Sequence, residues 1–254
     1  MQIVSCLLNA SNGFMGFYGF PGMFYRMDPT YSLVIIGAVI CMIASANVNR
    51  AFRKYSRYGS KRGITGAQAA QTLLYSAGIY DVTVEHVSGS LTDHYDPSAK
   101  VLRLSDATYG SSSVAAVGVA AHECGHAIQD NKNYAPLRLR STLVPAANLG
   151  SKAGIPIIIL GCILGYNMTL VQIGIWVFSL AVLFQLVTLP VEFDASRRAV
   201  RLLDEQHILQ GEEVGMCRKV LTAAAMTYVA AAASAIIQLL RLILIFGGGR
   251  RRDD

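Results

Sequence analysis

Four apolar segments constrain the fold of this chain more than any other feature. They are residues 31–48, 153–166, 170–191 and 228–246, and the one charged side chain within them is Arg241. About 20 apolar residues cross the hydrocarbon core of a bilayer as a helix, which satisfies its own backbone hydrogen bonds there. Hydrophobic residues make up 53% of the chain and charged residues 15%, a balance unlike that of an ordinary soluble domain. The sequence therefore predicts a mainly α integral membrane protein with about four transmembrane helices.

The distribution of positive charge predicts the orientation of these helices. Six lysines and arginines lie between residues 50 and 62, whereas only Arg26 and the opposing Asp28 flank the other end of the first segment. Because basic residues favour the cytoplasmic side, residue 50 onward is expected in the cytoplasm. The short link 167–169 makes a hairpin of the second and third segments, so the chain after residue 191 returns to the cytoplasm. Arg241 and Gln238 interrupt the fourth segment, whose topology stays open.

The net charge of +6 is assigned to contacts with anionic lipid headgroups, because the chain carries no nucleic-acid-binding motif. Residues 1–30 lack the basic start and the cleavage site of a signal peptide. Five cysteines are scattered without a C-x-x-C pair, so no disulfide framework is expected. The predicted partner is the lipid bilayer, and nucleic acid is not a predicted partner.

The predicted organisation has five parts. An N-terminal segment and first transmembrane helix occupy 1–48, and a transmembrane hairpin occupies 153–191. Between them, the polar region 49–152 is expected in the cytoplasm. It is predicted to hold a helix over 65–77, capped by Thr65 and ended by Gly78, and strands over 81–87, 91–96 and 100–104. The turn signal at 96–98 joins the last two strands. Residues 137–152 are expected to form an amphipathic helix at the membrane surface. Cytoplasmic helices over 192–226 and a fourth apolar helix with a basic tail over 227–254 complete the chain.

The pentapeptide His122-Glu123-Cys124-Gly125-His126 carries the strongest chemical signal. Residues four apart lie on one face of a helix, so two imidazoles at this spacing can hold one Zn²⁺ at about 2.0–2.1 Å. Glu123 would lie beside the metal, where it can take a proton from a water molecule and pass it to a leaving amine. This is the H-E-x-x-H arrangement of zinc metallopeptidases. Cys124 points away from the histidine face and is expected to be a small buried residue.

A catalytic zinc needs a third protein ligand, and the predicted topology restricts that ligand to the cytoplasmic side. His94 precedes the zinc helix, His207 lies in a polar stretch, and Glu192 directly follows the third apolar segment. A carboxylate at that membrane edge is costly unless a metal or a charged partner compensates it. Glu192 is therefore the preferred candidate, but a pairing with Arg197 or Arg198 explains it equally well. His94 is also considered as a donor to the developing oxyanion, or simply as a strand histidine held by neighbouring carboxylates.

The pattern resembles the YugP-type membrane zinc metallopeptidases, and more distantly the HtpX-type and CaaX-type membrane proteases. The resemblance covers most of the chain. It rests on motifs at 28–31, 65–66, 79–82, 93–96, 104–105, 120–129, 190–196 and 221–228. In HtpX-like relatives the zinc helix and an apolar hairpin precede a ligating glutamate in Glu-x-x-x-Asp. The resemblance thus implies His122, His126 and Glu192 as zinc ligands, a gluzincin-like set, and a cytoplasmic zincin-like α+β protease domain.

One position departs from that pattern, because Ser196 stands where the relatives have the aspartate. That aspartate can orient a zinc histidine, and such partners fix the imidazole tautomer. Asp194 stands two residues earlier and is expected to point elsewhere on a helix. Either Ser196 performs a weaker version of this role, or the carboxylate comes from another segment.

The predicted function is that of a zinc-dependent endopeptidase with Glu123 as general base and then acid. The resemblance implies a multi-pass protein of a bacterial cell membrane that cleaves membrane proteins or peptides at the cytoplasmic face. One alternative is a zinc-stabilised membrane scaffold that cuts nothing and has no use for Glu123. Another is a transport component in which Arg241 and Gln238 are pathway residues. Neither alternative explains the whole pentapeptide, and the sequence does not indicate an oligomeric state.

Overall fold

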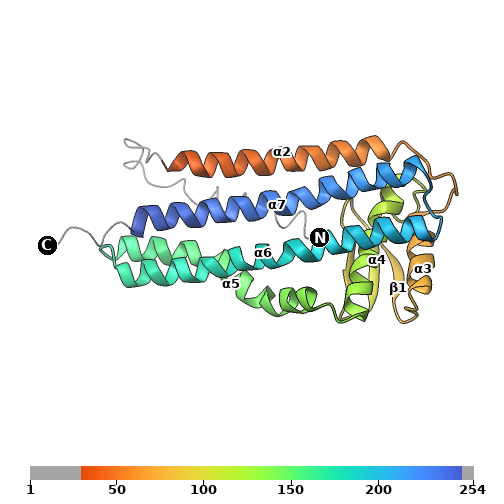
Figure 1. The fold of residues 1–254 in the computed structure, drawn as a ribbon. Coiled ribbons are helices and arrows are strands. Elements are labelled where there is room, and N and C mark those ends of the chain that lie inside the picture. The colour runs from red at the N-terminus through yellow and green to blue at the C-terminus, as the bar shows by residue number, and fades with distance from the viewer. Residues whose placement is uncertain (1–29, 248–254) are drawn as a thin grey trace. The chain divides into compact units, whose positions relative to one another are not determined.

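The computed structural model describes residues 30–247, which form a mostly helical protein with one small sheet (Figure 1). The helices are α2 (Tyr31–Tyr55), α3 (Gly66–Ser76), α4 (Val114–Asn131), α5 (Ala135–Ile163), α6 (Met168–Glu205) and α7 (Glu212–Phe246). The strands are β1 (Thr83–Val87), β2 (His94–Asp96) and β3 (Val101–Ser105). The predictions for residues 1–29 and for the arginines at 250–252 lie outside the described residues.

Four of the helices are long and apolar enough to cross a membrane, as the apolar segments predicted: α2, α5, α6 and α7. Each predicted segment forms only part of its helix. The third, for example, ends at residue 191, whereas α6 continues to Glu205. The helices therefore carry their backbone hydrogen bonds from apolar stretches into polar ones without a break.

Helix α5 differs from the expected pair of elements over 137–152 and 153–166. The two stretches form one helix from Ala135 to Ile163, although Pro145 and Pro156 lie inside it. Proline removes one backbone donor and usually bends a helix, but membrane helices tolerate it where neighbouring groups satisfy the freed carbonyl. No break in helical structure therefore separates the predicted amphipathic helix from the second apolar segment.

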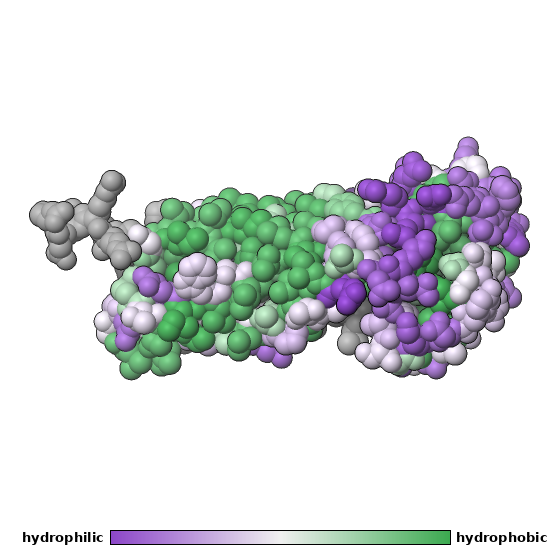
Figure 2. Space-filling model, turned by 60° about the horizontal axis from the view of Figure 1, so that its bottom comes forward, coloured by the Kyte–Doolittle hydropathy of each residue, from purple (hydrophilic) through white to green (hydrophobic). Residues whose placement is uncertain are grey.

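The chain divides into two compact units. The first, called the helical unit, comprises residues 30–43, 139–188 and 228–247 among those described. Its interior contains Ile158, Val171, Phe178 and Leu242, while many large hydrophobic side chains remain exposed. Figure 2 shows this apolar covering on the helices of the unit. A soluble protein rarely exposes so much contiguous apolar surface, whereas lipid-facing helices require it.

Arg241 has a defined environment within the helical unit. Its guanidinium lies 4.4 Å from the ring centroid of Tyr31, the first residue of α2. It also lies only five residues before the end of α7. The cation–π contact reduces the cost of the charge, while the buried Nε atom of Arg241 has no hydrogen-bond partner among residues 30–247.

The second unit, called the sheet unit, comprises residues 44–138 and 189–227. Its sheet has the strand order β1-β3-β2. β3 pairs parallel with β1, and antiparallel with β2 in the register Tyr95↔Leu102. The turn after residue 96 predicted the β2–β3 hairpin. The parallel β1–β3 pair was not predicted from local sequence, and it leaves β2 as an edge strand.

Helices α3 and α4 pack with each other and with this sheet (Figure 1). Thr65 caps α3 as predicted: its hydroxyl accepts from the Gln68 N–H, and the Gln68 side chain accepts from the Thr65 N–H. Ser113 caps α4 by accepting from the Ala116 N–H. The shared core contains Leu73, Leu74, Leu102, Leu104, Val114 and Val117, all fully buried. Burying each such side chain is worth about 1.5–3 kcal/mol, which fixes α4 firmly on the sheet.

Candidate metal centre

His122 and His126 lie one turn apart on α4, and Glu192 on α6 faces both of them. The Glu192 Oε2 atom is 3.3 Å from His122 Nε2 and 3.6 Å from His126 Nε2. The potential ligand atoms of the three residues all lie within 4.8 Å of one another. The imidazole rings are nearly perpendicular, at 82°, with centroids 4.8 Å apart. Within the described residues 30–247, this is the one such His/Cys/Asp/Glu group.

Gly125 brings α4 and α6 together at this point. A β-carbon at position 125 would lie 2.6 Å from the Ala195 carbonyl oxygen and 3.0 Å from the Ala195 Cα. Side chains essentially never approach backbone atoms that closely, so only glycine fits without a shift of one helix. The close approach carries Glu192, three residues before Ala195, to the histidine face of α4.

The outer nitrogen of each imidazole has its own partner. His122 Nδ1 lies 3.2 Å from Ser196 Oγ, and His126 Nδ1 lies 3.1 Å from Gln129 Oε1. The Gln129 amide nitrogen donates to the Val191 carbonyl at 2.9 Å and to Asp194 at 2.8 Å. Its oxygen must therefore face His126 and accept a hydrogen bond from Nδ1–H. The Nε2 atom of His126 then carries no proton, and its lone pair faces the Glu192 carboxylate.

The structure shows what accompanies the two zinc-site histidines now that Ser196 stands in place of the aspartate of the relatives. Ser196 contacts His122, while a carboxylate, Asp194, supports His126 through Gln129. Arg198 in turn donates to Asp194 and lies over the ring of Tyr134. Gln129 is fully buried, so its hydrogen bonds are shielded from water, whereas Asp194 and Arg198 are partly exposed. The carboxylate thus comes from the same helix as Ser196, two residues earlier.

These contacts test whether the site suits a metal ion. A carboxylate oxygen and two imidazole Nε2 atoms converge on one point, so a cation placed between them would be ligated by all three residues. Two imidazole nitrogens and one carboxylate oxygen form a donor set typical of catalytic zinc. Gln129 holds His126 in the tautomer that zinc requires, and the Ser196 hydroxyl is able to accept the Nδ1–H of His122 in the same way. The donor set fits Zn²⁺ on this chemistry.

Glu123 lies beside this cluster and is not part of it. Its Oε2 atom accepts the backbone N–H of Tyr95 on β2 at 3.0 Å, and the residue is 9% exposed. That N–H points away from β3, so it belongs to the free edge of the sheet. The Tyr95 hydroxyl donates to Asp130 at 2.9 Å, and Lys100 also contacts Asp130. Tyr95 therefore joins the edge strand to α4 at two points.

The environment of Tyr95 is consistent with a fixed structural contact. Burial, and then the hydrogen bond to Asp130, raise the pKa of the Tyr95 phenol well above its usual value. The phenol consequently stays protonated and remains a donor to Asp130 throughout the neutral range.

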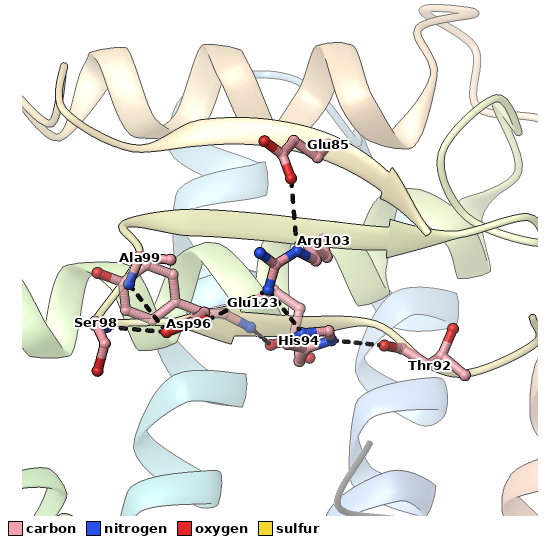
Figure 3. A network of polar contacts seen from close by, with 9 residues as sticks. Glu85, Thr92, His94, Asp96, Ser98, Ala99, Arg103 and Glu123 are labelled. Carbon is pink, nitrogen blue, oxygen red and sulfur yellow. Dashed lines mark hydrogen bonds and ion pairs between the residues drawn. The ribbon is translucent and has the colours of Figure 1, made fainter. Parts of the chain in front are cut away.

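The other residues weighed from the sequence lie outside the cluster. His94 Nδ1 donates to the Thr92 carbonyl at 2.8 Å, and its Nε2 faces Arg103 at 3.5 Å (Figure 3). Both ring nitrogens of His94 are thus engaged, by a carbonyl and an arginine rather than by the expected carboxylates. His207 is exposed in the turn after α6. Cys124 is buried as expected; its thiol donates to the Ala70 carbonyl, and burial raises its pKa.

Gln129 and Gly125 are two residues of the site that the sequence reasoning missed. Gln129 lies three residues after His126, so helix periodicity places it on the same face. That spacing could have identified it. The closeness of Gly125 to Ala195 could not be found from sequence, because it depends on a contact between segments 70 residues apart.

Replacing Gln129 by leucine is expected to weaken zinc binding by roughly 10–100-fold, the usual effect of losing a partner of a ligating histidine. Leucine keeps the volume but cannot accept from His126 Nδ1. Competition with a chromophoric chelator would measure the zinc affinity of the purified protein. The same change at the exposed Gln206 is the control and should leave affinity unchanged. An affinity within twofold of wild type for Gln129→Leu would contradict this role.

Comparison with known proteins relates the whole described chain to one family. A family model described as "Putative neutral zinc metallopeptidase" matches residues 30–247. The chain is also 44% identical over 198 residues to "Putative membrane protease YugP" of Bacillus subtilis (strain 168). That similarity covers 78% of this chain and 88% of the relative. No solved structure matches. The family match includes all three residues of the His-His-Glu cluster.

Proposed function

The chain belongs to the neutral zinc metallopeptidase family, as its motifs predicted, and from this premise we propose that it is a membrane-embedded zinc-dependent endopeptidase. Its proposed substrates are membrane proteins or peptides that reach the bilayer surface. One observation carries the proposal: His122, His126 and Glu192 converge on one point, while Glu123 is held separately at a sheet edge. A scaffold would need only the cluster, whereas hydrolysis also needs the separate carboxylate.

The metal of the proposed enzyme is Zn²⁺, held by His122, His126 and Glu192 in a gluzincin-like set. When bound, zinc would supply Lewis-acid chemistry, lowering the pKa of a water molecule to roughly 7 and polarising the scissile carbonyl. Ser196 and Gln129 would keep both imidazoles in the ligating tautomer. The zincin-like protease domain would be the sheet unit, which contains most of the predicted parts 49–152 and 192–226, whereas residues 139–152 belong to the helical unit.

Glu123 would perform both proton transfers of the reaction. A carboxylate oxygen takes a proton from the attacking water, whose oxygen bonds to the carbonyl carbon. The same oxygen then gives the proton to the amide nitrogen as the carbon–nitrogen bond breaks. The hydrogen bond from Tyr95 N–H holds the carboxylate in place for both steps.

The edge strand β2 would hold the substrate. An extended peptide can add to a free sheet edge through backbone hydrogen bonds, with little dependence on its sequence. The Tyr95 N–H is engaged by Glu123, so a peptide would pair with the outward-facing Tyr95 carbonyl oxygen and pass its backbone beside the general base. This arrangement suits an endopeptidase, because an edge strand does not require a chain end.

Metal removal tests the proposed function directly. Full-length protein in detergent should cleave an unfolded membrane-protein substrate. Treatment with a chelator should remove this activity, and added Zn²⁺ should restore it. Calcium or magnesium should not restore it, because two imidazoles and one carboxylate favour zinc. Absence of cleavage by zinc-loaded protein would support the scaffold alternative, and cleavage that persists after complete chelation would refute the proposed chemistry.

The active site is proposed to face the cytoplasm of a bacterial cell, on the evidence of the basic residues that follow the first apolar segment. A cysteine introduced at exposed Tyr80, before β1, should react with a membrane-impermeant maleimide in inverted vesicles only. A cysteine at exposed Tyr166, in the link between α5 and α6, should react in intact cells only. Labelling of wild type gives the background of the native thiols. Reaction of both positions from one side would disprove the predicted hairpin.

A further inference from the structure

A basic groove lies between α6 and α7 in the sheet unit. Its volume is about 470 Å³, within the range of roughly 300–1,000 Å³ that small-molecule sites occupy. Three arginines and one aspartate are its charged lining residues: Arg197, Arg201, Arg218 and Asp204. Arg201 pairs with Glu205, but no ion pair is found for Arg197 or Arg218 among residues 30–247. The groove therefore presents uncompensated positive charge.

One end of the groove is lined by apolar residues and the other end by basic residues. Phe193 and Arg201 are eight residues apart on α6, about 12 Å along the axis. α7 runs back after a short turn, so Arg218 lies towards the Arg201 end and Ala225 towards the Phe193 end. Phe193 is 40% exposed although it is a large hydrophobic residue. It also lies two residues after the end of the apolar stretch of α6, at residue 191.

We infer that this groove binds the headgroup of an anionic phospholipid. Its phosphate would lie between Arg197, Arg201 and Arg218, and its acyl chains would pass over the apolar lining residues Phe193 and Ala225. Arginine forms strong paired hydrogen bonds with phosphate, and basic pockets between membrane helices are suited to anionic headgroups. An acidic peptide is a poorer fit, because the lining comes from two helices and offers no strand edge for backbone pairing.

The groove also adjoins the candidate metal centre. Ser196 lines it and contacts His122 Nδ1 at 3.2 Å. A lipid held there would lie one side chain away from a ligating histidine. Binding of the lipid does not require that the protein be a peptidase, so the inference goes beyond the proposed function and is tested by binding alone.

Native mass spectrometry of the full-length protein, released from neutral detergent, would test this binding. Phosphatidylglycerol should be retained, and phosphatidylcholine should not. The double variant Arg197→Gln, Arg218→Gln should bind phosphatidylglycerol about tenfold more weakly or worse, given the attraction per basic residue near anionic lipid. The control Arg53→Gln, Arg57→Gln removes the same charge from α2 and the turn after it, and it should bind as wild type does. Thr222→Trp should also weaken binding, by filling the groove without changing its charge.

Three results would overturn the inference. The first is equal retention of phosphatidylglycerol by both double variants, which would show only general attraction to basic residues. The second is an equal thermal stabilisation by inorganic phosphate and by phosphatidylglycerol, since a free-anion site needs no lipid. The third is a groove-dependent affinity for a glutamate-rich peptide without any for phosphatidylglycerol, which would make the surface a peptide site.

Discussion

Replacement of Glu123 by glutamine is expected to lower peptide cleavage by about 10²–10⁴-fold or more while the zinc content stays at wild-type level. Positioned general acid–base groups contribute rate factors of this size. A glutamine oxygen can still accept the Tyr95 N–H, so the side chain should keep its position but lose its basicity. The measurement is turnover of an unfolded membrane-protein substrate, together with metal analysis of the same preparation.

The control for this substitution is Glu212→Gln, an exposed glutamate at the start of α7. It makes the same chemical change away from the site and should leave turnover unaltered. Full activity in the Glu123→Gln protein would disprove the role of general base. A loss of zinc in that protein would instead make Glu123 part of the metal-binding set.

Loss of the Glu192 carboxylate is the second change with a large expected effect. Glu192→Ala should weaken zinc binding by more than the 10–100-fold typical for a partner of a ligand, because it removes a proposed ligand itself. The variant should also lose stabilisation by zinc. A protein whose metal is present at 100 times its Kd gains about 2.7 kcal/mol, which appears as a higher Tm. Thermal unfolding with and without zinc would measure this difference.

Glu213 offers a matched control, since it is also a buried glutamate of the sheet unit. Its carboxylate accepts the backbone N–H groups of Lys61 and Gln210. Glu213→Ala should therefore lower the Tm of the metal-free protein, because two backbone donors lose their acceptor, and yet keep the response to zinc. A normal zinc response in Glu192→Ala would move the third ligand to another residue.

Local sequence predicted the elements of this protein well, because their causes are local. Apolar composition indicates the four membrane-length helices, even where Gln238 and Arg241 interrupt the fourth segment. Thr65 and Gln68 form the capping box of α3 within four residues, and the turn after Asp96 produces the β2–β3 hairpin. The spacing of His122 and His126 placed both imidazoles on one helical face in the same way.

The features that local sequence did not predict depend on contacts between distant segments. The parallel pairing of β1 with β3 passes over β2 in chain order, so no turn signal specifies it. Spacing alone left Glu192, His94 and His207 open as third ligand. The structure brings Glu192 to the two histidines, 66 residues after His126, and its role as ligand stays a prediction. Continuity of α5 through two prolines likewise depends on its surroundings.

The absent side chain at position 125 has a consequence for protein engineering. The Ala195 backbone occupies the space that a β-carbon at position 125 would need. The distance between the backbones of α4 and α6 therefore determines how far the Glu192 carboxylate lies from the two imidazoles. A designer who grafts the three donors onto another bundle would first need a pair of helices in backbone contact at that level. A saturation library at this codon should return glycine alone among zinc-retaining clones.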